Sequence, residues 1–294
     1  MPPTVGLREL AVGDGEQAPL RVLAMYPSRG KEETLTFGRY SLEAAKDAEI
    51  ERARMPLVVL SHGTGSTPLT FRGLAAHLAR EGAVVALPFH TGNHRDDDRL
   101  AHTFENLANR PRHVRAVIDG LFADPGIGPH LAPGQVAVVG HSLGAYTALA
   151  VAGGKPTCFP NETPDHVARA VPVEADARVR ALVLFAPAAV WYLREGSLAE
   201  VEVPVLLRSG AEDHLAPPAV HAEIVERGLA HLASFDAARV PRAGHFSFQS
   251  PFPPAMTRPD FPPSQDPPGF DRASYQPVLA AEVTSFLRRA LDFG

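Results

Sequence analysis

Short apolar runs alternate with segments of helical periodicity along most of this chain of 294 residues. Three of the runs, at residues 57–60, 136–139 and 181–185, are continuously apolar. Strands that are covered on both faces have this pattern, because neither face meets water. Strands that alternate with helices are typical of a mostly parallel sheet with helices on both sides. The pattern therefore predicts an α/β fold.

The apolar pattern predicts about eight strands and five helices in one domain, residues 1–294. The predicted strands are residues 7–12, 20–26, 57–62, 84–88, 135–140, 181–186, 203–209 and 238–240. The predicted helices are residues 68–81, 105–122, 142–151, 217–229 and 273–291. No internal repeat and no polar linker divides the chain into independently folding halves.

Two segments depart from this alternation and are expected to form irregular loops or small caps. Residues 153–177 mix Pro, Asn, Thr and Asp with little periodicity. Residues 251–268 contain eight prolines, so they cannot donate a ladder of backbone hydrogen bonds. Long ordered loops often carry function, although a rigid surface connector is an equal alternative. If residues 251–268 fold over the active site, they would narrow it and favour short or medium acyl chains.

Composition excludes several classes of protein. The chain is 45% hydrophobic and 21% charged with a net charge of −5, so we expect a globular protein with no nucleic-acid partner. A single cysteine, Cys158, excludes an intramolecular disulfide and a metal site built from cysteines. The sequence has no apolar run near the ~20 residues of a membrane span, and residues 1–6 lack the pattern of a secretory signal. We therefore expect a cytoplasmic location, while the oligomeric state stays open.

The strongest chemical signal is the segment Gly140-His141-Ser142-Leu143-Gly144, which lies between an apolar strand and a helix. A serine on such a sharp turn needs a strained backbone, and glycines on both sides let the turn close. This context is that of a nucleophile elbow, so Ser142 is the predicted nucleophile. The Leu143 amide, at the start of the helix, is a predicted donor to an oxyanion. An ordinary strand-to-helix turn is the alternative.

A nucleophilic serine needs a base that takes its proton and a carboxylate that orients the base. The acid follows the serine in the chain order typical of this elbow, and the histidine comes last. The strand at residues 203–209 leads into a loop with Asp213, which is the predicted acid. Its neighbour Glu212 is the competitor.

His245 is the predicted base, because it follows the last predicted strand and comes directly after Gly244 in a turn. His214 is too close to the acid in sequence, and His221 and His231 lie in or beside a predicted helix. A buried structural histidine is the alternative for His245.

The loop at residues 61–66 follows an apolar strand and precedes a helix, which is where the second oxyanion donor is expected. Its glycines let the backbone approach a substrate closely. The Thr64 amide is the first candidate and the Gly63 amide the second. His62 is interpreted as a support for this loop.

The segment at residues 90–98 offers two histidines and three aspartates. It lacks the spacing of a zinc or calcium site, and a polar loop at the rim of the active site accounts for it. No metal or other cofactor is therefore expected. Arg110, in the next helix, is expected to pair with one of these aspartates.

The chain resembles an α/β-hydrolase, because it carries Leu60-Ser61-His62-Gly63, then the elbow at residues 140–144, and then residues 244–248, in this order. More narrowly, residues 38–48, 56–78 and 88–93 are similar to bacterial proteins described as predicted dienelactone hydrolases. That group is similar in turn to platelet-activating-factor acetylhydrolases and polyester-cleaving lipases.

The resemblance implies an α/β-hydrolase fold, the triad Ser142, Asp213 and His245, and oxyanion donors at Leu143 and in the Gly63-Thr64 loop. Dienelactone hydrolases use a cysteine nucleophile, whereas this elbow carries a serine and Cys158 lies beyond the following helix. The resemblance thus implies a serine hydrolase acting on carboxylic esters.

We therefore expect a small-molecule ester as substrate and an acyl-enzyme on Ser142 as intermediate. A thioesterase, an amidase, an acyltransferase and a non-catalytic ligand-binding protein of the same fold are the alternatives. The predicted lining of the substrate pocket is Trp191, Tyr192, Phe246, Phe248 and His141. Packing in the core is the alternative for each aromatic residue.

Overall fold

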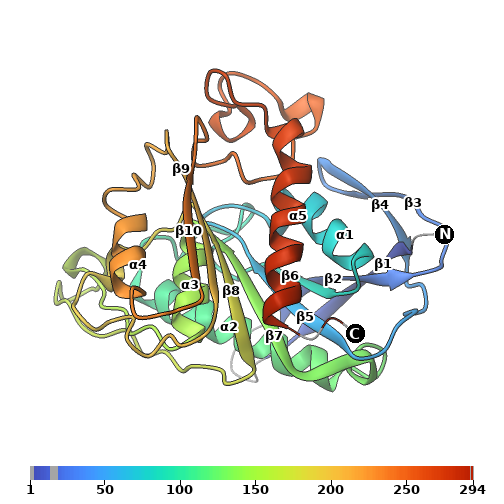
Figure 1. The fold of residues 1–294 in the computed structure, drawn as a ribbon, viewed down its shortest axis with the longest axis horizontal. Helices are drawn as coiled ribbons and strands as arrows, with labels where there is room; N and C mark the ends of the chain where they lie inside the picture. The colour runs from blue at the N-terminus through green and yellow to red at the C-terminus, as the bar shows by residue number, and fades with distance from the viewer. Residues whose placement is uncertain (1–2, 14–18, 292, 294) are drawn as a thin grey trace.

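The computed structural model describes residues 3–13, 19–291 and 293, and its centre is a ten-stranded sheet (Figure 1). The strand order is β10-β9-β8-β7-β5-β6-β2-β1-β4-β3. The strands are β1 (Thr4–Val12), β2 (Leu20–Ser28), β3 (Glu33–Phe37), β4 (Tyr40–Lys46), β5 (Met55–Ser61), β6 (Val84–Pro88), β7 (Leu131–His141), β8 (Val179–Phe185), β9 (Val205–Gly210) and β10 (Phe235–Val240). Every pair from β10 through β6 is parallel, and β2 joins them antiparallel to β6.

Helices cover both faces of this sheet, so the predicted α/β fold with a mostly parallel sheet is confirmed. The helices are α1 (Arg72–Arg80), α2 (Phe104–Ala123), α3 (Leu143–Val151), α4 (Ala222–Gly228) and α5 (Arg272–Ala290). Short 3-10 turns are η1 (Pro68–Phe71), η2 (Gly128–His130), η3 (Pro160–Glu162), η4 (Val190–Tyr192), η5 (Pro254–Met256) and η6 (Pro262–Ser264). Helices α1 and α5 pack on one face, and α2, α3 and α4 pack on the other (Figure 1).

The central strands are apolar throughout because successive side chains enter two different cores. In β5, Leu57 and Val59 belong to the core under α2 and α3, whereas Val58 and Leu60 belong to the core under α1 and α5. Side chains alternate between the faces of a strand, so a strand between two cores needs apolar residues at every position.

The sheet has two more strands than the eight that the sequence predicted, because β3 and β4 form a hairpin at its edge. Phe37 pairs with Tyr40, and the turn between them contains Gly38 at φ +61. The strand β3 is largely exposed and carries no buried residue, which hides it from a search for apolar runs. Alternating polar and apolar positions on both sides of Gly38 are the signal that indicates this hairpin.

The two irregular segments occupy different places. Residues 153–177 contain η3 and a bridge between Thr157 and Ala170. Residues 251–268 contain η5 and η6 and lie at the N-terminal end of α5 (Figure 1). None of the helices in the described part of the chain is long and apolar enough to cross a membrane.

Candidate active site

Ser142 is the single residue between the end of β7 and the start of α3, and its backbone has φ 55 and ψ −120. This is a strained conformation for a residue with a side chain, and it persists only where the surroundings fix it. The Ser142 amide donates to the Phe185 carbonyl at 3.0 Å, and the Ser142 carbonyl accepts from the Ala188 amide at 3.1 Å. The end of β8 and the segment after it thus hold the elbow in place.

The two flanking glycines are required by close packing. A Cβ on Gly140 would lie 2.2 Å from the Gly144 carbonyl oxygen, and a Cβ on Gly144 would lie 1.9 Å from that of Ser61. Both contacts are with backbone atoms, which cannot move aside as a side chain can. The spacing of the motif therefore reflects how closely α3 approaches β5.

Asp213 and His245 form a buried hydrogen-bonded pair. The Nδ1–H of His245 donates to Oδ2 of Asp213 at 2.7 Å. The other oxygen, Oδ1, accepts from the amides of Leu215 at 2.9 Å and Ala216 at 2.8 Å. The Asp213 side chain is fully buried and that of His245 is 8% exposed. Because a carboxylate only accepts hydrogen bonds, the proton of a neutral His245 lies on Nδ1, and Nε2 is an acceptor.

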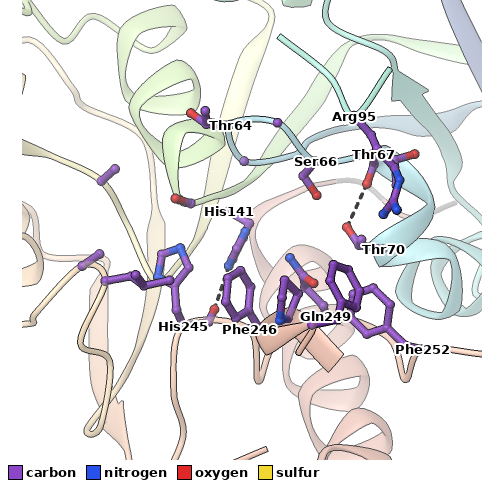
Figure 2. Close-up of a pocket in the computed structure, with 18 of the residues that line it drawn as sticks. Thr64, Ser66, Thr67, Thr70, Arg95, His141, His245, Phe246, Gln249 and Phe252 are labelled. Carbon is purple, nitrogen blue, oxygen red and sulfur yellow. Dashed lines mark hydrogen bonds between the residues drawn. The ribbon is translucent and has the colours of Figure 1, made fainter. Parts of the chain in front are cut away.

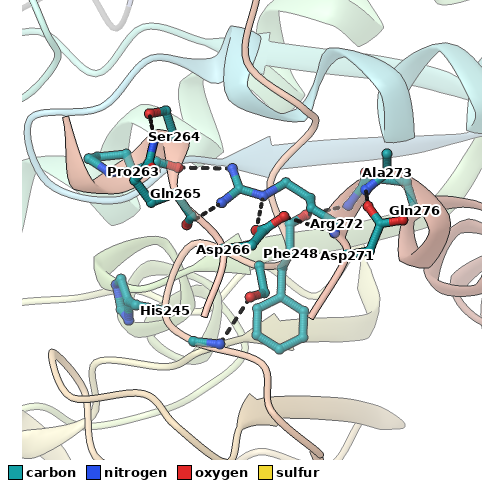
Figure 3. A network of polar contacts seen from close by, with 12 residues as sticks. His245, Phe248, Pro263, Ser264, Gln265, Asp266, Asp271, Arg272, Ala273 and Gln276 are labelled. Atoms are coloured by element: carbon teal, nitrogen blue, oxygen red, sulfur yellow. Dashed lines mark hydrogen bonds and ion pairs between the residues drawn. The ribbon is translucent and has the colours of Figure 1, made fainter. Parts of the chain in front are cut away.

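Ser142 and His245 line the same cavity, so the structure brings together the three residues that the sequence analysis selected (Figure 2). The carboxylate that reaches His245 belongs to Asp213 and not to its neighbour Glu212. His141 also lines the cavity, and its Nε2 donates to the His245 carbonyl at 2.8 Å. Burial, reinforced by His245, lowers the pKa of His141 to about 3, so its ring stays neutral. His141 thereby fixes the loop that carries the base.

The loop after β5 passes directly over the elbow. A Cβ on Gly63 would lie 3.1 Å from the Cβ of Ser142, which explains the glycine. The amides of Gly63, Thr64 and Leu143 form no hydrogen bond with another residue in the described ranges. These three N–H groups are therefore available to a ligand next to Ser142.

A fully buried arginine supports this loop from behind. Arg110, on α2, donates to the His62 carbonyl, to Ser61 Oγ at 3.2 Å, to Asn93 Oδ1 at 2.6 Å and to Thr147 Oγ1 at 3.1 Å. All four acceptors are neutral, and burial lowers the pKa of Arg110 to about 9. Arg110 thus connects the loop after β5 to helix α3 and to the loop after β6.

His62 supports the next peptide unit of the same loop. Its Nδ1–H donates to the Gly63 carbonyl at 2.8 Å, and its Nε2 lies 3.5 Å from the His90 amide, which donates to it. Burial and the nearby Arg110 hold the pKa of His62 well below its usual value, so the ring is neutral. The carbonyls of the 62–63 and 63–64 peptides are therefore both hydrogen-bonded. Since polarisation passes through a peptide unit, these bonds strengthen the Gly63 and Thr64 amides as donors.

The expected pairing of Arg110 with an aspartate is wrong. Its guanidinium contacts Asn93, and the Asn93 amide donates in turn to Asp98 Oδ1 at 2.6 Å, so the carboxylate is one step away. Among residues 90–98, His90 faces inward and contacts Ser61 Oγ at 2.9 Å, whereas Asp97 pairs with Arg99. The described residues contain no cluster of three or more His, Cys, Asp or Glu side chains that could hold a metal ion.

The cavity has a volume of about 450 Å³ and is lined by two of the five predicted pocket residues, Phe246 and His141. Trp191, Tyr192 and Phe248 lie outside it, contrary to expectation. The Trp191 Nε1–H donates to the Glu162 carboxylate at 2.9 Å, and the Tyr192 hydroxyl donates to the Tyr146 carbonyl at 2.8 Å.

Phe248 is fully buried and stacks on Phe185, with ring centroids 5.4 Å apart. Phe248 therefore packs in the core, and Trp191 and Tyr192 pack against Tyr146 of α3. Residue type alone does not distinguish an aromatic residue of the core from one that lines a pocket.

Residues that the sequence analysis did not select complete the lining of the cavity. They include Tyr40 on β4, Arg95 after β6, Gln249 after His245, and Phe252 and Phe261 from the proline-rich segment. Figure 2 shows Arg95, Gln249 and Phe252 among them. Residues 251–268 thus form part of the wall of the cavity that holds His245. Only Gln249 and Phe252 are close to His245 in sequence, which is the one signal that pointed to them.

Comparisons with known proteins agree with this fold. Residues 58–197 match the sequence model of the alpha/beta hydrolase family. A ferulic acid esterase from Streptomyces cinnamoneus has a TM-score of 0.71 at 22% identity, covering 99% of this chain and 90% of that one. A search of curated protein sequences finds no match.

Two further solved structures are similar over nearly their whole length. A dienelactone hydrolase from Anabaena variabilis has a TM-score of 0.57 at 19% identity, covering 97% of this chain and 99% of that one. A dienelactone hydrolase-like promiscuous phosphotriesterase from metagenomic libraries has a TM-score of 0.67 at 15% identity, covering 98% and 100%. At these identities the likeness is one of fold.

The buried arginine makes the first testable prediction. Arg110→Met leaves four buried acceptors without their donor, so we expect it to lower the free energy of unfolding by about 3 kcal/mol. Urea denaturation followed by circular dichroism measures this change. Arg288→Met is the matched control, because Arg288 is half-exposed and pairs with Glu81 on the surface, where such pairs contribute less than about 1 kcal/mol. Equal losses in the two variants would contradict the supporting role of Arg110.

Proposed function

This chain has the fold of the α/β-hydrolases, and we propose that it is a serine hydrolase that cleaves carboxylic esters through an acyl-enzyme on Ser142. One observation carries the proposal: His245, hydrogen-bonded to the buried Asp213, lines the same cavity as Ser142, which lies on a strained elbow. Nucleophile, base and orienting carboxylate are the parts that acyl transfer needs.

The first half of the reaction forms the acyl-enzyme. Ser142 Oγ attacks the ester carbonyl carbon while its proton passes to His245 Nε2, and Asp213 stabilises the imidazolium at Nδ1. The Leu143 amide and the Thr64 or Gly63 amide donate to the oxyanion, each contributing roughly 2.7 to 4 kcal/mol. Collapse of the tetrahedral intermediate breaks the bond to the alcohol oxygen, which takes the proton from Nε2 and leaves.

The second half hydrolyses the acyl-enzyme. Water attacks the acyl carbon while His245 Nε2 takes one of its protons, and the resulting intermediate collapses to expel Ser142 Oγ, which regains a proton from Nε2. The carboxylic acid then leaves. These side chains and amides, with water, account for every proton transfer and every hydrogen bond, so neither half of the reaction needs a cofactor.

Esters are favoured over other acyl compounds by the comparisons. Two of the similar structures are an esterase and a dienelactone hydrolase. A thioesterase, an amidase or an acyltransferase would use the same steps on Ser142. A non-catalytic binding protein is disfavoured because candidates for all three triad residues are present in one place.

Labelling with a serine-directed fluorophosphonate tests the nucleophile. Mass spectrometry of the intact protein and its peptides should show a single adduct on Ser142, because this hydroxyl shares a cavity with His245 and lies next to free amide donors. Ser142→Ala should lose both the adduct and nitrophenyl acetate hydrolysis. An unmodified wild-type protein, or an adduct on another serine, would overturn the proposal.

The size of the cavity predicts a limit on acyl chain length. Phe252, Phe261 and Pro263 from the proline-rich segment wall a space of about 450 Å³, so kcat/KM on nitrophenyl esters should peak at short or medium chains and fall for long ones. Phe261→Ala removes part of that wall and should move the optimum to longer chains. A steady rise in kcat/KM up to the palmitate ester would show that this wall does not limit the substrate.

A further inference from the structure

Three residues that line the cavity have a buried polar atom with no hydrogen-bond partner in the described part of the chain: His141 at Nδ1, next to Ser142 in sequence, and the pair Gln249 and Tyr40. Gln249 is 2% exposed and its Oε1 contacts no donor in the described part of the chain. Tyr40 is 4% exposed and its hydroxyl is likewise unpartnered there. A buried polar group without a partner is costly, so a native structure rarely keeps one without a reason. Both side chains line the cavity of Ser142, which indicates that a ligand completes their hydrogen bonds.

Arg95 adds a cation to the same part of the cavity. Figure 2 shows it on the side away from His245, with Gln249 between them. In the ranges that the structure describes, Arg95 forms no ion pair, whereas the nearby Arg99 pairs with Asp97. The backbone amide of Arg95 donates to the Ser66 carbonyl at 2.7 Å, which ties its position to the loop after β5.

Aromatic rings form the wall beside these polar groups. The rings of Tyr40 and Phe252 are 6.3 Å apart, and those of Phe252 and Phe261 are 5.3 Å apart in an edge-to-face arrangement. The Arg95 guanidinium lies 5.7 Å from the centre of the Phe261 ring. Aromatic walls of this kind favour another flat ring, because edge-to-face and stacked contacts add to the burial of apolar surface.

We propose that Tyr40, Arg95 and Gln249 form a subsite for a hydroxyl group on an aromatic ring, carried by the acid or the alcohol part of the ester. The proposal rests on the function proposed above and names the class of substrate for the same site. A hydroxyl donates one hydrogen bond to Gln249 Oε1 and accepts others from Arg95 and Tyr40.

Other groups fit this set of side chains less well. A carboxylate would satisfy Arg95 and Tyr40, but it has no proton for Gln249 Oε1. An alkyl chain would leave all three polar groups unpaired. Burial raises the pKa of Tyr40, against the opposing effect of Arg95 and Arg72, so the Tyr40 hydroxyl keeps its proton and is able to donate.

Two pairs of esters test the subsite in the full-length protein. The first pair is methyl 3-(4-hydroxyphenyl)propanoate and methyl 3-phenylpropanoate, with the ring in the acid. The second is 2-(4-hydroxyphenyl)ethyl acetate and 2-phenylethyl acetate, with the ring in the alcohol. We expect the hydroxyl to raise kcat/KM by about tenfold or more in at least one pair, since a site built to bind a hydroxyl discriminates strongly against its absence.

Substitutions of the subsite residues test whether the preference for the hydroxylated ester arises there. Gln249→Leu and Tyr40→Phe should each abolish most of the hydroxyl preference, measured as the ratio of kcat/KM within a pair. Arg99→Met is the matched control and should keep the ratio of the wild type, because Arg99 is paired with Asp97 outside the subsite. No preference in either pair, or a preference that survives both Gln249→Leu and Tyr40→Phe, would overturn the inference. A larger kcat/KM for the 4-carboxy analogues would also overturn it, since the subsite would then bind an anion.

Binding to Ser142→Ala separates this inference from the proposed function. Titration calorimetry with the same four esters measures affinity and not turnover, so it reports on the subsite whether or not the protein hydrolyses esters. We expect the hydroxylated ester of the preferred pair to bind about tenfold more tightly than its parent. Equal affinities would contradict the subsite even if the protein hydrolyses esters. Tighter binding of the hydroxylated ester, in a wild-type protein that hydrolyses none, would contradict the proposed function alone.

Discussion

The 2.7 Å hydrogen bond between His245 and Asp213 is the contact on which the site depends. It joins the loop after β9 to the loop after β10, and it determines which nitrogen of His245 carries the proton. Two amides, from Leu215 and Ala216, hold the Asp213 carboxylate in place. His141, the residue before the serine, holds the backbone of His245. The orientation of His245 is therefore fixed from both sides, by Asp213 at its ring and by His141 at its carbonyl.

A second set of buried contacts supports the loop after β5, which carries the proposed oxyanion donors Gly63 and Thr64. Arg110 and His62 hydrogen-bond successive carbonyls of the loop that lies against Ser142. A fully buried guanidinium with only neutral acceptors is costly to desolvate, which makes it an unusual choice for packing alone. In the proposed reaction, negative charge develops on the substrate oxygen next to this loop. A buried cation behind the loop then favours the charged transition state over the neutral substrate.

The sequence predicts the centre of the molecule well because its signals are local. The continuous apolar runs of β5, β7 and β8 follow from burial on both faces, and the spacing of Gly140 and Gly144 follows from backbone contacts at the turn. The hairpin of β3 and β4 was missed because an exposed edge strand carries charges that interrupt the apolar pattern. The periphery of a sheet is the part that such patterns describe least.

The lining of the cavity depends on contacts between distant segments, and the sequence predicts these poorly. Trp191 and Phe248 are the kind of residue that lines a pocket, yet Phe248 packs in the core and Trp191 packs against it. Phe261, in contrast, reaches the cavity from a proline-rich segment without periodicity. Arg110 was assigned an aspartate that is near in sequence, whereas its acceptors come from three other elements. The roles of Ser142, Asp213 and His245 in catalysis stay predictions, supported by their geometry.

A double-mutant cycle on the acid and the base tests the central claim most directly. The measurement is kcat/KM for nitrophenyl acetate in Asp213→Asn, in His245→Gln and in the double variant, with each protein checked for native folding by circular dichroism. If Asp213 acts only through His245, each single change lowers kcat/KM by about 10⁴-fold, and the double variant is no worse than the worse single one. Losses that multiply in the double variant, or a single variant with wild-type activity, would contradict the account.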